Sequence, residues 1–171
     1  MRGRVMIILP RFCFRATELA MADIWFYHLT SLPLERALPT LLSKTLEREK
    51  RAVVMTGNEQ RIDAINTLLW TYDPASWLPH GSKSDGDPEM QPVWLTTDDE
   101  NPNGAQFLFL TDRAMSDKVA DYERVIMLFD DRDHDAVAEA RTRWKDWKDA
   151  GHKLSYWQQS PQGAWEKKAE S

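Results

Sequence analysis

The sequence contains a single cysteine, Cys13, among its 171 residues. One thiol cannot form an internal disulfide, and it cannot supply the several thiolates that a cysteine-rich metal site needs. Sparse use of cysteine is typical of proteins that stay in a reducing compartment. We therefore expect the protein to be cytoplasmic.

Glycine is also scarce, and the loops that cradle phosphates in nucleotide-binding proteins are missing. The segment TSLPLE after the first expected strand has no glycine, and TGNEQ after the second has one. A dinucleotide fingerprint needs several glycines so that the backbone can approach a pyrophosphate, and a P-loop needs Gly-Lys-Ser/Thr. We therefore expect no bound nucleotide and no other cofactor.

Catalytic and metal-binding patterns are missing as well. The sequence has no GxSxG nucleophile elbow, and its four histidines lack zinc-ligand spacing: His28, His80, His134 and His152. The acidic run Asp130–Asp135 resembles the start of a calcium loop, but Ala136 replaces the required glycine and Thr142 the bidentate glutamate. An acidic first turn of a helix explains this run better. We interpret the protein as non-enzymatic, with a nucleotide-dependent hydrolase as a weaker alternative.

Long hydrophobic runs are absent, and the charge is unevenly distributed. The apolar run Val5–Leu9 is shorter than a signal-peptide core of roughly 7–15 residues. We interpret residues 1–20 as a disordered or artefactual extension, Met21 as the working start, and residues 21–171 as one domain. The net charge is −5, and residues 1–20 contribute +3, which leaves −8 on the rest. A body this acidic repels phosphate backbones, so general nucleic-acid binding is not expected.

What the sequence does contain is an alternation of strand and helix patterns. Strands are expected over Asp23–Leu29 and Arg51–Thr56, and helices over Leu34–Glu47 and from the capping-box segment Thr56–Glu59 to about Trp70. This order predicts a layered α/β fold with parallel strands.

Further strands are expected over Pro92–Thr96, Gln106–Leu110, Arg124–Phe129 and His152–Gln158, and around Trp165. The connection between the first two is short for a parallel crossover. These two strands are therefore either antiparallel neighbours or not adjacent.

The helix that begins near Asp133 and ends before Gly151 carries two distinct faces. Ala136, Ala140 and Trp147 share one side, as a core-facing stripe would. Three cations fall together just beyond it, next to an indole: Arg141, Lys145 and Lys148 beside Trp144. Spacing alone leaves two interpretations open, namely a core helix with a solvated charged face, or a docking face for a short acidic and apolar segment.

A second candidate surface lies between the two halves of the sequence. Trp70 and Trp77 are in a stretch broken by Pro74 and Pro79, which can form neither a long helix nor a central strand. The stretch is either a loop that caps the core or a hydrophobic hot spot for a protein partner.

Several segments, in this order, resemble the chi subunit of bacterial DNA polymerase III. They are IWFYHL, INTLLW with DPASWLPHG, DDENPNGA, the long segment from YERVIMLFDD to YWQQ, and GAWEKKA. The likeness extends over essentially all of residues 22–169. It implies a three-layer α/β/α fold with a mostly parallel sheet, Rossmann-like but without a nucleotide site, and an accessory role in DNA replication without catalysis.

The resemblance also implies two protein partners and the residues that contact them. The acidic C-terminal tail of single-stranded DNA-binding protein would be held by Arg141, Trp144, Lys145 and Lys148, with Phe129 a weaker candidate. The psi subunit, through which chi joins the clamp loader, would contact Trp70, Pro74 and Trp77. Nucleic acid would then be contacted mainly indirectly. An alternative is direct binding of single-stranded nucleic acid through Trp157, Trp165, Lys153, Lys167 and Lys168.

Overall fold

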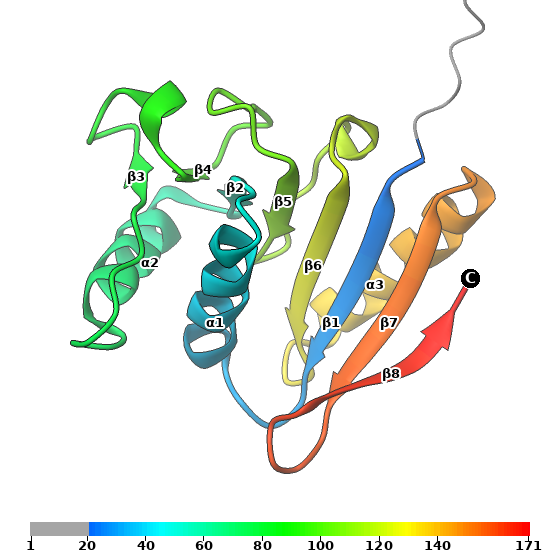
Figure 1. The fold of residues 1–171 in the computed structure, drawn as a ribbon. Helices are drawn as coiled ribbons and strands as arrows, with labels where there is room; N and C mark the ends of the chain where they lie inside the picture. Colours follow the sequence, from blue (N-terminus) through cyan, green and yellow to red (C-terminus); the bar gives the residue numbers. More distant parts are fainter. Residues whose placement is uncertain (1–20) are drawn as a thin grey trace, which may run out of the picture.

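The computed structural model describes residues 21–171, in which strands and helices alternate along most of the chain (Figure 1). The proposed N-terminal extension and Cys13 lie outside the described residues. The elements are β1 (Asp23–Leu29), α1 (Leu34–Glu47), β2 (Ala52–Met55), α2 (Glu59–Thr71), β3 (Gly81–Ser82), the 3-10 turn η1 (Pro88–Met90), β4 (Val93–Thr96), β5 (Phe107–Leu110), the 3-10 turn η2 (Val119–Asp121), β6 (Arg124–Asp130), α3 (His134–Asp149), β7 (Lys153–Gln159) and β8 (Trp165–Glu170).

The strands form one eight-stranded sheet in the order β3-β4-β2-β5-β6-β1-β7-β8. Every neighbouring pair is parallel except the last, in which β8 runs antiparallel to β7. This confirms the α/β fold with a mostly parallel sheet. Strand β2 lies between β4 and β5. These two strands are therefore not adjacent, which was one of the two arrangements that their short connection allowed.

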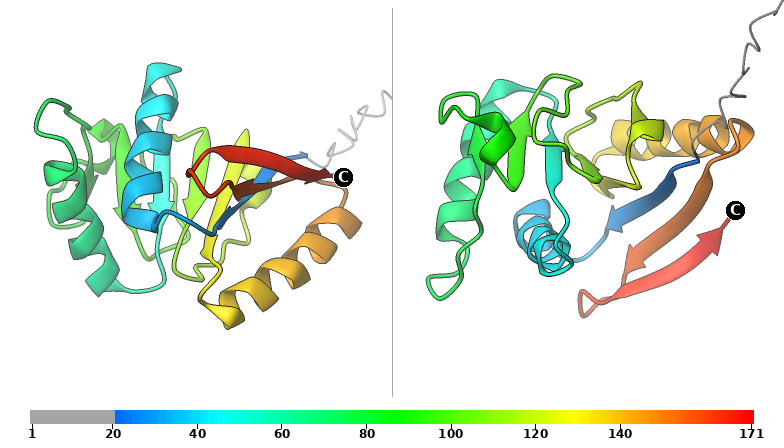
Figure 2. Two further views of the ribbon diagram at one scale, coloured as in Figure 1. Left: turned by 90° about the horizontal axis from the view of Figure 1, so that it is seen from below. Right: turned by 45° about the horizontal axis from the view of Figure 1, so that its top comes forward.

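Helices cover both faces of this sheet, which is why its central strands are apolar throughout. All four residues of β2 and of β5 are buried, as expected for parallel strands between two helical layers. Helices α1 and α2 pack on one face, and α3 packs on the other (Figure 2).

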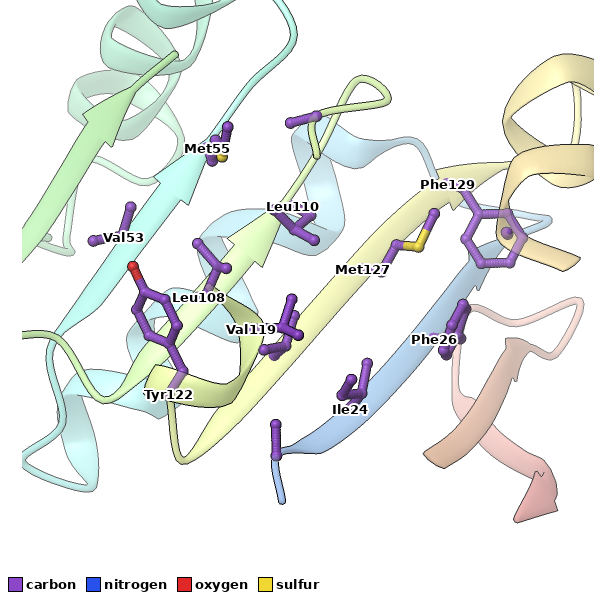
Figure 3. Close-up of a cluster of buried hydrophobic side chains, with 14 of the residues drawn as sticks. Ile24, Phe26, Val53, Met55, Leu108, Leu110, Val119, Tyr122, Met127 and Phe129 are labelled. Atoms are coloured by element: carbon purple, nitrogen blue, oxygen red, sulfur yellow. The ribbon is translucent and has the colours of Figure 1, made fainter. Parts of the chain in front are cut away.

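The face that α3 covers is built from alternate residues of neighbouring strands (Figure 3). Phe26 of β1 and Met127 and Phe129 of β6 point to this side, and Val119 and Tyr122 from the segment around η2 close its other end. Helix α3 is the single α-helix that packs on this face of the described chain. Its position therefore decides where this side of the sheet stays accessible.

Local capping interactions fix where the helices begin and end. The Asp133 side chain accepts a hydrogen bond from the Ala136 backbone N–H (3.0 Å), so this aspartate is the N-cap of α3. Gly151 follows α3 with φ +87°, which confirms the predicted glycine stop. The expected capping box at Thr56 was wrong by two positions, because Asn58 caps α2 by accepting from the Arg61 N–H at 3.0 Å.

The segment Gly81–Gln91, which its polar composition predicts to be a flexible loop, contains regular structure. Gly81 and Ser82 are buried and pair with Trp94 and Leu95 of β4 as the edge strand β3. A Cβ atom on Gly81 would lie 2.6 Å from the Gln91 side chain, so glycine permits the close approach. A strand of two residues is too short to show an apolar or alternating pattern, so the polar composition of the segment does not predict it.

The chain's own groups fill the carboxyl ends of β2 and β5, where doubly wound folds commonly hold a phosphate. A Cβ on Gly57, after β2, would lie 2.2 Å from the carbonyl oxygen of Asp112, after β5. Arg61 is 2.9 Å from the Asp112 carboxylate and 3.4 Å from that of Glu35. The two loops therefore pack on each other, and a basic residue that could have met a phosphate is already paired.

Candidate functional site

A cavity of about 450 Å³ lies between α3 and the strands β6, β1 and β7. Its lining is mainly apolar and comes from five elements: Phe26, His28, Phe129, Val137, Ala140, Arg141, Trp144, Tyr156 and Ala169. A concave, largely apolar site with a few polar groups is the usual form of a binding site for a small ligand or a peptide anchor.

Aromatic side chains hold one wall of the cavity in place. Phe26 of β1 packs edge-to-face on Trp144 of α3, with ring centroids 5.2 Å apart, and lies 5.7 Å from Trp147. Such aromatic pairs contribute about 0.5–1.5 kcal/mol beyond simple burial. Trp144 is only partly buried, so one part of its indole anchors the helix while the rest faces the cavity.

The opposite end of the cavity is polar. His28 of β1 is buried, and its Nδ1 lies 2.7 Å from the hydroxyl of Tyr156 on β7. Its Nε2 lies 3.0 Å from Asp131, although out of line for a hydrogen bond. The imidazole also stacks on Phe129, with centroids 4.6 Å apart. The histidine is therefore held on three sides, as expected for a structural residue, yet it also lines the cavity.

Burial determines the protonation of both polar groups. It lowers the pKa of His28 below its ordinary 6.5, against the opposing pull of Asp131. Burial also raises the pKa of the Tyr156 phenol, and the negative charge of Asp131 adds to this effect. In the unliganded protein near neutral pH, both side chains are accordingly uncharged.

The three predicted cations of α3 are exposed, and only one of them lines the cavity. Arg141 is part of the lining with Trp144, whereas Lys145 and Lys148 lie further along the exposed side of the helix. None of the three forms an ion pair with an acidic side chain of residues 21–171. Their positive charge is thus available to a ligand.

A further arginine of the same helix is a core residue, which the sequence reasoning missed. Arg143 is buried, and its Nη1 donates to the Ala114 carbonyl at 2.9 Å. Burial lowers its pKa, while the nearby carboxylate of Glu139 opposes the effect. The spacing could have shown this, because Arg143 follows Ala136 by seven residues and Ala140 by three, and so shares their face.

The last turn of α2 and the loop that follows it expose two indoles. Trp70 is 59% exposed and Trp77 is 75% exposed, and Pro74 between them is exposed as well. A core-capping role is therefore wrong for these three residues. Leu78 and His80 instead anchor the loop in the core.

His80 lies close to polar groups of the protein on both sides of its buried ring. Nδ1 lies 2.7 Å from the Leu78 carbonyl oxygen, and Nε2 lies 2.9 Å from Oδ1 of Asn66 on α2. Both ring nitrogens thus face polar groups of the protein, as those of a structural histidine do. The Trp70 ring also packs near the His80 ring, with centroids 4.9 Å apart.

The residues of the alternative nucleic-acid surface do not form a free basic face. Trp157 and Trp165 pack against Tyr27 on the α1 side of the sheet. The three lysines lie within 4 Å of carboxylates of β8: Lys153 and Lys167 of Glu170, and Lys168 of Glu166. Their charge is largely balanced by the strand itself.

Residues 21–171 contain no helix that is long and apolar enough to cross a membrane. Within the same range, no three side chains of histidine, cysteine, aspartate or glutamate are grouped as metal ligands would be.

The fold and the cavity define a three-layer α/β protein with a mostly parallel sheet and an apolar cavity between α3 and that sheet. Residues 21–155 match the family described as DNA polymerase III chi subunit, HolC. The chain is 28% identical over 154 residues to the "Probable DNA polymerase III subunit chi" of Rickettsia prowazekii (strain Madrid E), which covers 86% of this chain and 92% of that relative. The chain belongs to the DNA polymerase III chi subunit family.

Membership confirms the resemblance seen in the sequence. It also supports the coarser part of the functional expectation, an accessory role in DNA replication as a subunit of a polymerase complex.

Proposed function

We propose that this chain is a non-catalytic adaptor that joins the clamp loader, through the psi subunit, to single-stranded DNA-binding protein on DNA. One observation carries the proposal: Arg141 lines an apolar cavity, Lys145 and Lys148 follow on the exposed side of the same helix, and none of the three has an acidic partner within residues 21–171. It favours the docking-face interpretation of α3 over a merely solvated charged face.

The chemistry of the cavity suits an acidic peptide that ends in an aromatic residue. The ring would enter the apolar part between Phe129 and Trp144, where aromatic contacts are available. Arg141 would bind a carboxylate through its planar fork of N–H donors, and Lys145 and Lys148 would add compact charge nearby. On an otherwise acidic body, this local positive field would also steer the peptide to the site.

The exposed indoles at the end of α2 and in the α2–β3 loop form the proposed contact with psi. Trp70 and Trp77 present large apolar areas next to Leu78 and His80, which anchor this segment in the core. A partner that buries them would lose little entropy in ordering the loop. Truncating an indole at the centre of such an interface costs roughly 2–4 kcal/mol.

The tail site is tested by calorimetry with a synthetic peptide of the acidic tail. We expect Arg141→Ala combined with Lys145→Ala to weaken binding by about 10- to 100-fold, because one carboxylate contact and part of the steering field are lost. The remaining affinity should depend less on salt.

A matched control removes two exposed cations from the other helical layer, Lys44→Ala with Arg48→Ala in and after α1. This variant has the same net charge as the Arg141/Lys145 variant and should bind almost normally. Unchanged affinity in the Arg141/Lys145 variant, or an equal loss in the control, would overturn the assignment.

The second contact is tested by co-purification with psi. Trp77→Ala should abolish recovery of psi, whereas Met90→Ala, which removes another exposed apolar side chain, should not. Recovery of psi at full yield with Trp77→Ala would contradict the proposed surface.

A further inference from the structure

The polar end of the cavity contains an arrangement that suits regulation by pH. His28 and Tyr156 line the cavity on neighbouring strands, and their side chains are 2.7 Å apart. This inference rests on the proposed function, because it concerns how the same cavity receives an acidic peptide.

When His28 and Tyr156 are both uncharged, the pair offers the cavity hydrogen-bond acceptors but no donor. A neutral imidazole carries one N–H and one lone pair. The nearby Asp131 carboxylate favours the proton on Nε2, which leaves the Nδ1 lone pair to accept the Tyr156 O–H. The phenol then presents only lone pairs to the cavity, and lone pairs repel a carboxylate.

Protonation of His28 reverses this arrangement. An imidazolium donates from both nitrogens, so Nδ1–H donates to the Tyr156 oxygen and Nε2–H faces Asp131. The phenol O–H is then released and can donate into the cavity. Tyr156 retains its proton throughout, since burial raises its pKa.

We propose that a carboxylate of the acidic peptide binds between Arg141 and Tyr156, and that its entry is coupled to the uptake of one proton by His28. Protonation turns the Tyr156 hydroxyl into a donor to the ligand. The His28–Tyr156 pair is therefore a positioning element that makes the affinity for the peptide depend on pH.

Charged groups from each neighbouring segment set the direction of this coupling. Asp130 and Asp131 after β6 favour the imidazolium, while Arg141 of α3 and burial oppose it. Arg141 and Lys168 of β8 also act on the phenol across the cavity. A bound carboxylate would screen Arg141 and add negative charge, so the pKa of His28 is higher in the complex than in the free protein. Affinity must then rise as the pH falls.

The experiment measures binding of the acidic tail peptide by calorimetry from about pH 7.5 to about pH 5.5, a range above the ordinary pKa values of the peptide's carboxylates. Because binding raises the pKa of His28, the wild type should bind several-fold more tightly at the lower pH than at the higher pH. Repeating the titration in two buffers that differ in ionisation enthalpy should show net proton uptake on binding within this pH range.

Three variants identify the residue responsible. His28→Gln should bind with an affinity that no longer changes with pH. Tyr156→Phe should lose most of the change, because only the electrostatic coupling between the bound carboxylate and His28 remains. His134→Gln, a matched loss of an exposed histidine at the start of α3, should keep the wild-type dependence. Tyr156→Phe removes one hydroxyl without changing the ring, so it decides the matter if His28→Gln fails to fold.

The outcomes separate this inference from the proposed function. Absence of peptide binding by the wild type at every pH overturns the proposed function, and this inference with it. Binding that does not vary with pH overturns the inference alone, as does a wild-type pH dependence that survives in Tyr156→Phe.

Discussion

Replacing Gln159 should destabilise the fold because one side-chain oxygen organises the whole turn that follows β1. Gln159 is buried at the end of β7, and its Oε1 accepts hydrogen bonds from three consecutive backbone N–H groups, those of Thr30 (3.1 Å), Ser31 (3.0 Å) and Leu32 (2.9 Å). Gln159→Leu keeps the size of the side chain and removes this acceptor.

The expected loss follows from these three hydrogen bonds. At a net value of about 1 kcal/mol each, they sum to about 3 kcal/mol. Because residues 30–32 are exposed, water can replace part of the interaction, and we expect a loss of about 2 kcal/mol in the free energy of unfolding. For a domain of this size that corresponds to a fall of roughly 4–8 °C in Tm.

Urea unfolding monitored by tryptophan fluorescence measures this loss, and Gln158→Leu is the matched control. Gln158 is the preceding residue of β7, and its side chain makes no hydrogen bond within the described part of the chain. The control should change stability by less than about 0.5 kcal/mol. Equal stability of the two variants would refute the idea that the glutamine oxygen holds the turn.

Two further predictions concern the α1 and α2 side of the sheet. Asn58→Ala removes the cap that accepts from Arg61 N–H and should cost about 1 kcal/mol in urea unfolding, and Asn58→Ser should recover most of it. Burial raises the pKa of the Tyr27 phenol from 10.0 to about 12. The buried neutral phenol therefore contributes fully to the free energy of unfolding below pH 10, and this contribution is lost as the pH rises towards 12. The free energy of unfolding should therefore fall by roughly 2 kcal/mol over that range, measured by denaturant titration, and by clearly less in Tyr27→Phe; an equal fall in both would contradict the assignment.

Much of the architecture could be predicted because it depends on local patterns. The apolar runs of β2 and β5, the leucine face of α1 and the glycine after α3 each follow from neighbouring residues. The short connection between β4 and β5 leaves two arrangements, antiparallel neighbours or strands that are not adjacent. Only the pairing of both strands with β2, which joins distant parts of the sequence, decides between them.

The candidate site was predictable on one helix and not beyond it. Helical spacing brought Arg141 and Trp144 together because both lie on α3. His28 and Tyr156 are 128 positions apart in the sequence and meet only because β1 and β7 pair in register. Short-range periodicity carries no information about such a contact, so the polar end of the cavity could not be foreseen.

The arrangement of the strands has a mechanical consequence for the proposed adaptor role. Helix α2 contacts β3 and β4, whereas α3 contacts β6 and β7 on the opposite side of the sheet. Between β4 and β1 lie four inter-strand steps, or roughly 20 Å of hydrogen-bonded backbone. The two proposed docking surfaces therefore lie on opposite faces of one continuous sheet, so a force on one bound partner would reach the other through hydrogen-bonded strands rather than through a flexible linker.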